Sequence, residues 1–259
     1  MKTFTTLLAL FSAVGALAAG GATSQPRASL ATVYYSCVNN KEAALTFDDG
    51  PYVWLYDISK FLVAAGGKGT FCFNGNNWAC IYDTASQNRV KYAHAHGHQL
   101  VSHTWSHPLS FDQIHNEMWR IEQALERIVG VSPAFLRPPY GNYNNLVRQV
   151  AKQRNQSIIM WDLDTGDSLG ASVAHSEKVY SDAVAKNPRN ILALNHETYS
   201  STAETIVPYA IKLLKSKGYQ LVTVAECLGG LAPYQWTAAP QTPSSFESNA
   251  LIWIPWIPI

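Results

Sequence analysis

The stretch "ALTFDDGPY", Ala44–Tyr52, sets two aspartates directly after an apolar run and ends that run with Gly50 and Pro51. Side chains of a strand alternate between its two faces. Asp48 and Asp49 can therefore act together only where the strand stops and the chain turns. Two negative charges at the rim of a strand repel each other unless a cation lies between them or one of them serves as a base. At this point either aspartate can take either role.

Short β-like runs alternate with longer amphipathic stretches along the rest of the chain. Strands are predicted at residues 43–47, 69–73, 98–102, 134–138, 157–162, 191–196 and 220–224, and helices at 54–65, 110–129 and 202–217. This alternation favours an α/β fold with parallel strands and crossover helices, closed into a barrel or doubly wound. With 259 residues, of which 47% are hydrophobic and 14% charged, the chain suits one globular domain.

Ionisable residues gather at the ends of the predicted strands. Five strands are followed, in chain order, by Asp48 and Asp49, by His103 and His107, by Arg137, by Asp162, Asp164 and Asp167, and by His196. In a β/α barrel the loops after the strands build the active site. These side chains therefore predict one site at the C-terminal ends of the strands.

Two of these residues have the spacing of metal ligands. His103 and His107 are four residues apart, which would place both rings on one face of a helical turn. With one of the two aspartates they form a two-histidine, one-carboxylate site of the kind that binds a catalytic divalent metal. Zinc suits such mixed ligands best, and cobalt, nickel or manganese are chemically possible. Surface histidines are the alternative interpretation of the spacing alone.

Proton transfer would need further partners. His196 suits a proton donor because imidazole titrates near neutrality, and a carboxylate such as Asp167 could hold its ring. Arg137 could orient the base aspartate through a charge-assisted hydrogen bond. The alternatives are a structural salt bridge for Arg137 and a hydrogen-bonded core histidine for His196.

The chain ends differ in composition from the middle. An apolar stretch after Lys2 ends in a small-residue pattern, which predicts a signal peptide and a secreted, extracellular or cell-wall protein. The predicted segments are a signal peptide at 1–18, an N-terminal extension at 19–36, a catalytic domain at 37–230 and a Pro-rich apolar tail at 231–259. No transmembrane segment is predicted. A retained N-terminal helix and a lipid-anchor signal in the tail are the alternatives.

Four cysteines in an exported chain suggest disulfides. Cys72 and Cys80 flank "FNGNNWA", a short polar loop that a bridge could pin. Cys37 and Cys227 could then tie the ends of the domain together. Free buried thiols are the alternative. The tripeptide "NQS" also makes Asn155 a candidate glycan acceptor.

Five segments together resemble the polysaccharide deacetylases of carbohydrate esterase family 4, the NodB-homology family, and within it the secreted fungal chitin deacetylases. They are "TFDDGP" (46–51), "HTWSH" (103–107), "RPPYG" (137–141), "DTGD" (164–167) and "LNH" (194–196). The resemblance covers roughly residues 40 to 228. It implies a distorted (β/α) barrel of the NodB/polysaccharide deacetylase type and a metal-dependent removal of acetyl groups from sugars.

The resemblance also implies a role for each residue at the strand ends. Asp48 would be the general base, Asp49, His103 and His107 the metal ligands, Arg137 the tether of the base, His196 the general acid and Asp167 its orienting partner. The backbone N–H of Tyr140 would complete an oxyanion hole with the metal.

One motif departs from the family pattern. The fourth motif usually ends in Asp-Trp, whereas Ser168 follows Asp167 here, so the shape of the groove and the substrate preference stay open. Aromatic residues in the strand-end loops are the candidates for sugar contact: Tyr140, Trp105 and Trp78, and also Trp54 and Tyr143. Ordinary packing is the alternative for each of them.

The predicted function is hydrolysis of N-acetyl groups on N-acetylglucosamine units of chitin or its oligosaccharides by a monomer. The net charge of +1 and the lack of a dense basic run argue against a nucleic-acid partner and fit a neutral polysaccharide. An acetylxylan O-esterase, a peptidoglycan N-acetylglucosamine deacetylase and a non-catalytic sugar-binding protein are the alternatives on the same scaffold. A phosphohydrolase is disfavoured because Arg137 is the single basic residue in these motifs.

Overall fold

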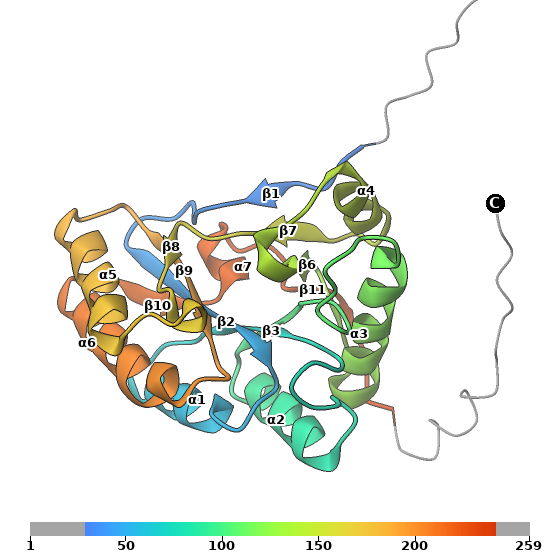
Figure 1. The fold of residues 1–259 in the computed structure, drawn as a ribbon, viewed down its shortest axis with the longest axis horizontal. Coiled ribbons are helices and arrows are strands. Elements are labelled where there is room, and N and C mark those ends of the chain that lie inside the picture. Colours follow the sequence, from blue (N-terminus) through green and yellow to red (C-terminus); the bar gives the residue numbers. More distant parts are fainter. Residues whose placement is uncertain (1–28, 242–259) are drawn as a thin grey trace, which may run out of the picture.

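A computed structural model describes residues 29–241 of the chain (Figure 1). The strands are β1 Val33–Tyr34, β2 Glu42–Gly50, β3 Thr70–Phe73, β4 Gln99–Ser102, β5 Val131–Pro133, β6 Phe135–Leu136, β7 Ser157–Ile159, β8 Leu163–Asp164, β9 Ile191–His196, β10 Gln220–Val222 and β11 Tyr234–Thr237. The helices are α1 Leu55–Ala64, α2 Thr84–Ala95, α3 Ile114–Val129, α4 Asn145–Gln153, α5 Val173–Ala185, α6 Val207–Ser216 and α7 Val224–Cys227, with short helical turns at Pro139–Gly141, Asp167–Leu169 and Thr202–Ile206. Each of the predicted strands and helices overlaps one of these elements.

One parallel sheet forms the centre of the molecule. Its strands follow the order β1-β7-β6-β4-β3-β2-β9-β8, and β10 pairs with the first residues of β2. Every pairing in this sheet is parallel. Helices flank the curled sheet on several sides (Figure 1). The predicted distorted (β/α) barrel is therefore confirmed, and the doubly wound alternative is not.

The alternation of side chains in β2 divides the core into two layers. Leu45 and Phe47 belong to the large apolar cluster that the sheet shares with the surrounding helices. Ala44 belongs to a second cluster that also takes residues from β3, β4, β6, β7 and β9 and so fills the inside of the barrel. Thr46 and Asp48 point to this same inner side, because strand residues alternate. The inner face of β2 thus turns from apolar to charged toward its C-terminal end.

The short helix α7 closes the opposite end of the barrel. Its N-terminus lies across the first residues of β3 and β4, where Val224 N–H donates to Thr70 Oγ1 at 2.9 Å and Ala225 N–H donates to Gln99 Oε1 at 2.8 Å. A disulfide joins Cys227 of α7 to Cys37, just before β2, as predicted. The N-terminal end of the barrel is therefore sealed, and the C-terminal ends of the strands stay open for a site.

Two strands lie outside the predicted limits of the catalytic domain, 37 and 230. β1 pairs with β7, and β11 pairs antiparallel with β5. Pro233 and Pro240 flank β11 but do not interrupt it, so the Pro-rich composition does not prevent pairing there. The packed unit thus extends on both sides of those limits.

The predicted signal peptide and most of the predicted tail fall outside the described residues. Within residues 29–241 no helix has the length and apolar character needed to cross a membrane.

The predicted Cys72–Cys80 disulfide is wrong, because both cysteines are free. Cys72 lies in the middle of β3 and faces the inside of the barrel, while its neighbours Phe71 and Phe73 face the helices. Cys80 lies beyond the following loop, in an isolated bridge with Asn76. The alternation of β3 therefore directs the Cys72 thiol away from the loop that a bridge would have pinned.

Candidate active site

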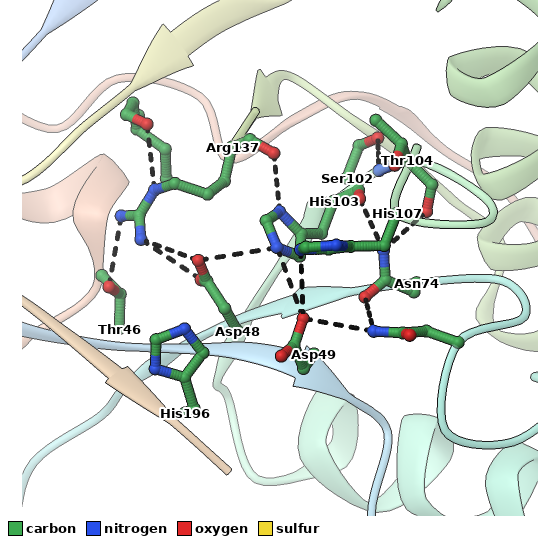
Figure 2. Close-up of polar contacts among 12 residues, drawn as sticks. Thr46, Asp48, Asp49, Asn74, Ser102, His103, Thr104, His107, Arg137 and His196 are labelled. Atoms are coloured by element: carbon green, nitrogen blue, oxygen red, sulfur yellow. Dashed lines mark hydrogen bonds and ion pairs between the residues drawn. The ribbon is translucent and has the colours of Figure 1, made fainter. Parts of the chain in front are cut away.

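The two aspartates of the opening motif face one cleft because the strand bends between them. The register between β2 and β3 shifts between Asp48 and Gly50, and Asp49 has a left-handed φ of 73°. Aspartate tolerates this conformation better than most residues. The turn brings both carboxylates to the same cleft, where Figure 2 shows both of them facing the imidazole of His103.

Glu197, which directly follows the neighbouring strand β9, supports this bend. It is completely buried, and its Oε1 accepts a hydrogen bond from Tyr52 N–H at 2.7 Å. A Cβ atom on Gly50 would lie 1.7 Å from this oxygen, so only glycine fits there. Burial raises the pKa of Glu197 well above its usual range. Glu197 was not among the predicted site residues, although it directly follows the "LNH" motif.

Asp49, His103 and His107 converge in space. The Asp49 Oδ1 atom lies 3.6 Å from His103 Nε2 and 3.4 Å from His107 Nε2, and the three ligand atoms all lie within 4.8 Å of one another. Ligands about 2.0–2.2 Å from a tetrahedral metal ion are separated by roughly 3.5 Å, so these distances fit a divalent ion. The predicted members of the metal site are thus brought together.

The hydrogen bond of His103 and the pKa of His107 also fit metal binding. His103 Nδ1 lies 2.7 Å from the carbonyl oxygen of Arg137, which makes Nδ1 the donor and leaves the Nε2 lone pair facing Asp49 (Figure 2). Burial and the neighbouring His103 lower the pKa of His107 to about 4, so its ring is neutral at neutral pH. Metal ligation requires neutral imidazole. The donor set therefore suits a divalent metal.

The spacing of the two histidines predicted a helical turn, and this prediction is wrong. Residues 103–107 form an irregular loop after β4, with left-handed φ angles at Thr104 (69°) and His107 (53°). Glu117 of α3 holds this loop, because its carboxylate accepts from Ser106 N–H at 2.7 Å and from the Ser106 hydroxyl at 3.0 Å. The loop thus replaces the expected turn and brings the same two rings together.

Asp48 is held by a fully buried arginine. Arg137 Nη1 lies 3.2 and 3.4 Å from the two carboxylate oxygens of Asp48. The other donors of the guanidinium bond Thr46 Oγ1 and the carbonyl oxygens of Ile159 and Met160. Burial alone would raise the pKa of Asp48, but Arg137, together with His103 and His196, lowers it below its usual range. Asp48 is therefore an oriented carboxylate, and Arg137 lies where its predicted role requires.

His196 and Asp167 form the second proton-transfer pair. His196 Nδ1 lies 2.8 Å from Asp167 Oδ1, and Asp167 Oδ2 accepts from His196 N–H at 2.7 Å and from the Thr202 hydroxyl at 2.8 Å. Burial disfavours the imidazolium, but Asp167 and the charges of Asp48 and Asp49 outweigh it and raise the pKa of His196 to about 9. His196 Nε2 is then a protonated donor that faces the cleft.

The cleft over these residues has a volume of about 480 Å³, and several aromatic side chains line it. Tyr140, at a left-handed φ of 58°, is 64% exposed on the rim and packs edge-on against the ring of His107. As the second residue of a 3-10 turn, its backbone N–H has no partner within that turn. Trp78 is half exposed on the same cleft. The contact of Tyr140 and Trp78 with substrate stays a prediction.

The prediction that Trp105 binds substrate is wrong. Trp105 is buried and lies beneath the guanidinium of Arg120, 4.0 Å from its ring centre. A Cβ atom on Gly75 would lie 1.9 Å from this indole, so the ring fills the space under the loop after β3. Trp54 and Tyr143 also pack against apolar clusters, which agrees with ordinary packing, the alternative to sugar contact for these two residues. Trp105 therefore stabilises the loop that carries the histidines and does not face the cleft.

Other residues of the cleft were not singled out from the sequence. Tyr199, Trp161 and Leu169 line it, next to Ser168 of the fourth motif, which also lines the cleft. Asn77 donates from Nδ2 to Asp49 Oδ1 at 3.3 Å, and its position in a polar loop directly after a strand is a signal that could have revealed it. Of the three aspartates after the fifth predicted strand, Asp164 lines the cleft, whereas Asp162 accepts from Leu192 N–H.

Comparison with known proteins agrees with this geometry. The polysaccharide deacetylase family profile matches residues 35–158. A chitin deacetylase of Pestalotiopsis sp is 34% identical over 230 residues, which cover 83% of this chain and 74% of that protein. A chitin deacetylase of Colletotrichum lindemuthianum is 32% identical over 245 residues, 89% of this chain and 98% of that protein. The solved structure of the chitin deacetylase from that fungus has a TM-score of 0.76 at 30% identity and covers 83% of this chain and 99% of that one.

A parallel half-barrel is thus the architecture that this chain shares with the solved chitin deacetylase, and in this chain a cluster of two histidines and a carboxylate lies at the strand ends. The chain belongs to the polysaccharide deacetylase family, carbohydrate esterase family 4. The predicted resemblance is confirmed.

Proposed function

We propose that this chain is a metal-dependent hydrolase that removes the N-acetyl groups of N-acetylglucosamine units in chitin or chitooligosaccharides and releases acetate. One observation carries the proposal: an oriented carboxylate, Asp48, and a protonated imidazole, His196, line one cleft together with the Asp49, His103 and His107 cluster. Two groups whose surroundings favour opposite protonation states suit a base and an acid. The chitin deacetylases among the relatives support the substrate.

Asp49, His103 and His107 would hold the divalent metal, for which zinc is the expected ion and cobalt the second candidate. Such an ion, when bound, acts as a Lewis acid on the amide carbonyl and lowers the pKa of a water molecule. The neutral form of His107 and the hydrogen bond from His103 Nδ1 to a backbone oxygen support this ligand set.

The remaining residues would carry the protons. Asp48, held by Arg137, takes a proton from the attacking water while the water oxygen bonds to the acetyl carbon. The backbone N–H of Tyr140 stabilises the negative charge that develops on the carbonyl oxygen. When the C–N bond breaks, His196 Nε2 gives its proton to the amine nitrogen, and Asp167 holds the ring during this transfer. The products are acetate and the free amino sugar.

The cleft supports a neutral sugar polymer as substrate. It is open and carries the exposed ring of Trp78 on one side, which suits stacking against a sugar face. Arg137 is fully buried and engaged by Asp48, so no free guanidinium is available there to bind a phosphate. We propose that the protein acts as a monomer and that it is secreted, and the Cys37–Cys227 disulfide supports secretion.

The test is acetate release by the purified chain from chitin oligomers and, in parallel, from acetylated xylan, each with and without a chelator. We expect release from the chitin oligomers that stops with the chelator and returns with added zinc or cobalt. Asp48→Asn should keep the metal and lose turnover, while His103→Ala should lose both. Release from xylan alone would contradict the amide substrate, and release that ignores the chelator would contradict the metal.

A further inference from the structure

The loop after β3 supplies no candidate ligand, yet it lies between the two segments that do. The Asp49 carboxylate comes from the end of β2, and the histidines come from the loop after β4. Two asparagines of the intervening loop, Asn74 and Asn77, contact both segments. We refer to this pair as the asparagine brace.

Asn74 fixes the histidine loop. It is 1% exposed, and its backbone N–H donates to Gly50 O at 2.8 Å, which ties it to the end of β2. Its Nδ2 donates to His103 O at 2.6 Å and to Thr104 O at 3.1 Å (Figure 2). These bonds hold the backbone at the left-handed Thr104, where the chain turns between the two histidines. One buried amide thus links the two ligand-bearing segments.

Asn77 fixes the carboxylate. Its Nδ2 lies 3.3 Å from Asn74 Oδ1 and 3.3 Å from Asp49 Oδ1. This Asp49 oxygen is the one that lies closest to the Nε2 atoms of His103 and His107. A hydrogen bond to a ligand oxygen limits rotation of the carboxylate and keeps that oxygen aimed at the ion. The brace therefore acts on the carboxylate and on the histidine loop at the same time.

We propose that Asn74 and Asn77 are positioning residues that preorganise the metal site, Asn74 through the histidine loop and Asn77 through Asp49. This inference rests on the metal site of the proposed function. Without Asn77 the Asp49 carboxylate samples other rotations, and the ion must order it on binding. Outer partners of metal ligands typically affect metal affinity by about 10- to 100-fold.

The test compares Asn77→Ala with Asn76→Ala in the full chain. Asn76 is the matched control because it is the same residue type, is exposed in the same loop, and its side chain has no hydrogen bond to any residue from 29 to 241. Metal affinity is measured by competition of the metal-free protein with a chromophoric chelator for zinc. The visible absorption of the cobalt-loaded protein reports the geometry of the ligands.

We expect Asn77→Ala to weaken zinc binding by about 10-fold or more and to alter the cobalt spectrum. Asn76→Ala should stay within about twofold of the unchanged chain, and the melting temperature of the metal-free protein should be the same for both, since Asn77 is exposed. If the unchanged chain binds zinc and Asn77→Ala binds it equally well with the same cobalt spectrum, the positioning role is overturned. If the unchanged chain binds no zinc, the metal site of the proposed function fails instead.

Discussion

His196 stays protonated because nearby carboxylates, chiefly Asp167, outweigh its burial. Burial lowers the pKa of His196, but Asp167, with Asp48 and Asp49, raises it to about 9, so the ring is an imidazolium at neutral pH and loses its proton as the pH rises through that value. We expect kcat/KM for chitin oligomers to fall above about pH 9. In Asp167→Asn the negative charge is lost, and this alkaline limb should move down by at least about one pH unit, toward the ordinary histidine pKa.

The control is Asp164→Asn, which removes a carboxylate from the same cleft without touching His196. Its alkaline limb should stay in place, and an unmoved limb in Asp167→Asn would count against His196 as the acid.

The His196–Asp167 pair also affects the free energy of unfolding. Because the folded pKa of His196 is raised, its contribution is complete below the unfolded value of 6.5 and is lost as the pH rises toward about 9.

At this scale the sequence predicted where the ionisable residues gather, since a strand end followed by an ionisable residue needs only the period of the strand. Asp48, Arg137 and His196 all lie where that pattern predicts. It could not predict which aspartate faces which partner, because the left-handed turn at Asp49 is a property of the folded loop. Asn77 was missed for a related reason: its contact with Asp49 crosses between two loops.

At the scale of loops and strands, two tryptophans that both follow strands differ in exposure. Trp105 is 7% exposed beneath Arg120, whereas Trp78 is 50% exposed on the cleft. We expect Trp105→Ala to lower the free energy of unfolding by about 3–5 kcal/mol, because it empties a buried site. Trp78→Ala should change that free energy by less than about 0.5 kcal/mol and raise KM for chitin oligomers by about 2- to 10-fold.

Urea unfolding followed by fluorescence, and initial rates at several oligomer concentrations, measure the two quantities. Each variant serves as the other's control, since both remove an indole from a loop after a strand. Equal stability losses would mean that Trp78 also packs structurally. A change in KM without a loss of stability in Trp105→Ala would mean that Trp105 contacts the substrate in the cleft.

The sequence could not separate these two residues, because both follow strands and both lie in polar loops. The contact of Trp105 with Gly75 joins segments 30 residues apart and depends on the path of both loops. β11 was missed on similar grounds, since its partner β5 lies about a hundred residues earlier and the flanking prolines indicated an irregular tail. Parallel strands with their own apolar runs, such as β2 and β9, were predicted because their signal is local.

At the scale of the whole molecule, the Cys37–Cys227 disulfide closes the domain. The two cysteines are 190 residues apart, so the bond restricts the unfolded chain strongly. We expect the double variant Cys37→Ser, Cys227→Ser to lose about 2–5 kcal/mol in the free energy of unfolding. Urea unfolding with and without a reductant measures this, and the reductant should affect the unchanged chain but not the double variant.

The two other cysteines provide the control variant and the expected number of free thiols. Cys80→Ser removes a free thiol, so the reductant should lower the free energy of unfolding of this variant as much as it does in the unchanged chain. Thiol titration of the unreduced chain in denaturant should find both Cys72 and Cys80 reactive, while before unfolding Cys72 should resist the reagent because it is buried inside the barrel. If no thiol reacts in denaturant, a second bridge joins them, and the inward orientation of Cys72 in β3 is refuted. If all four react, the bond that ties α7 to the start of the domain is absent, and the sealed end of the barrel must rest on packing alone.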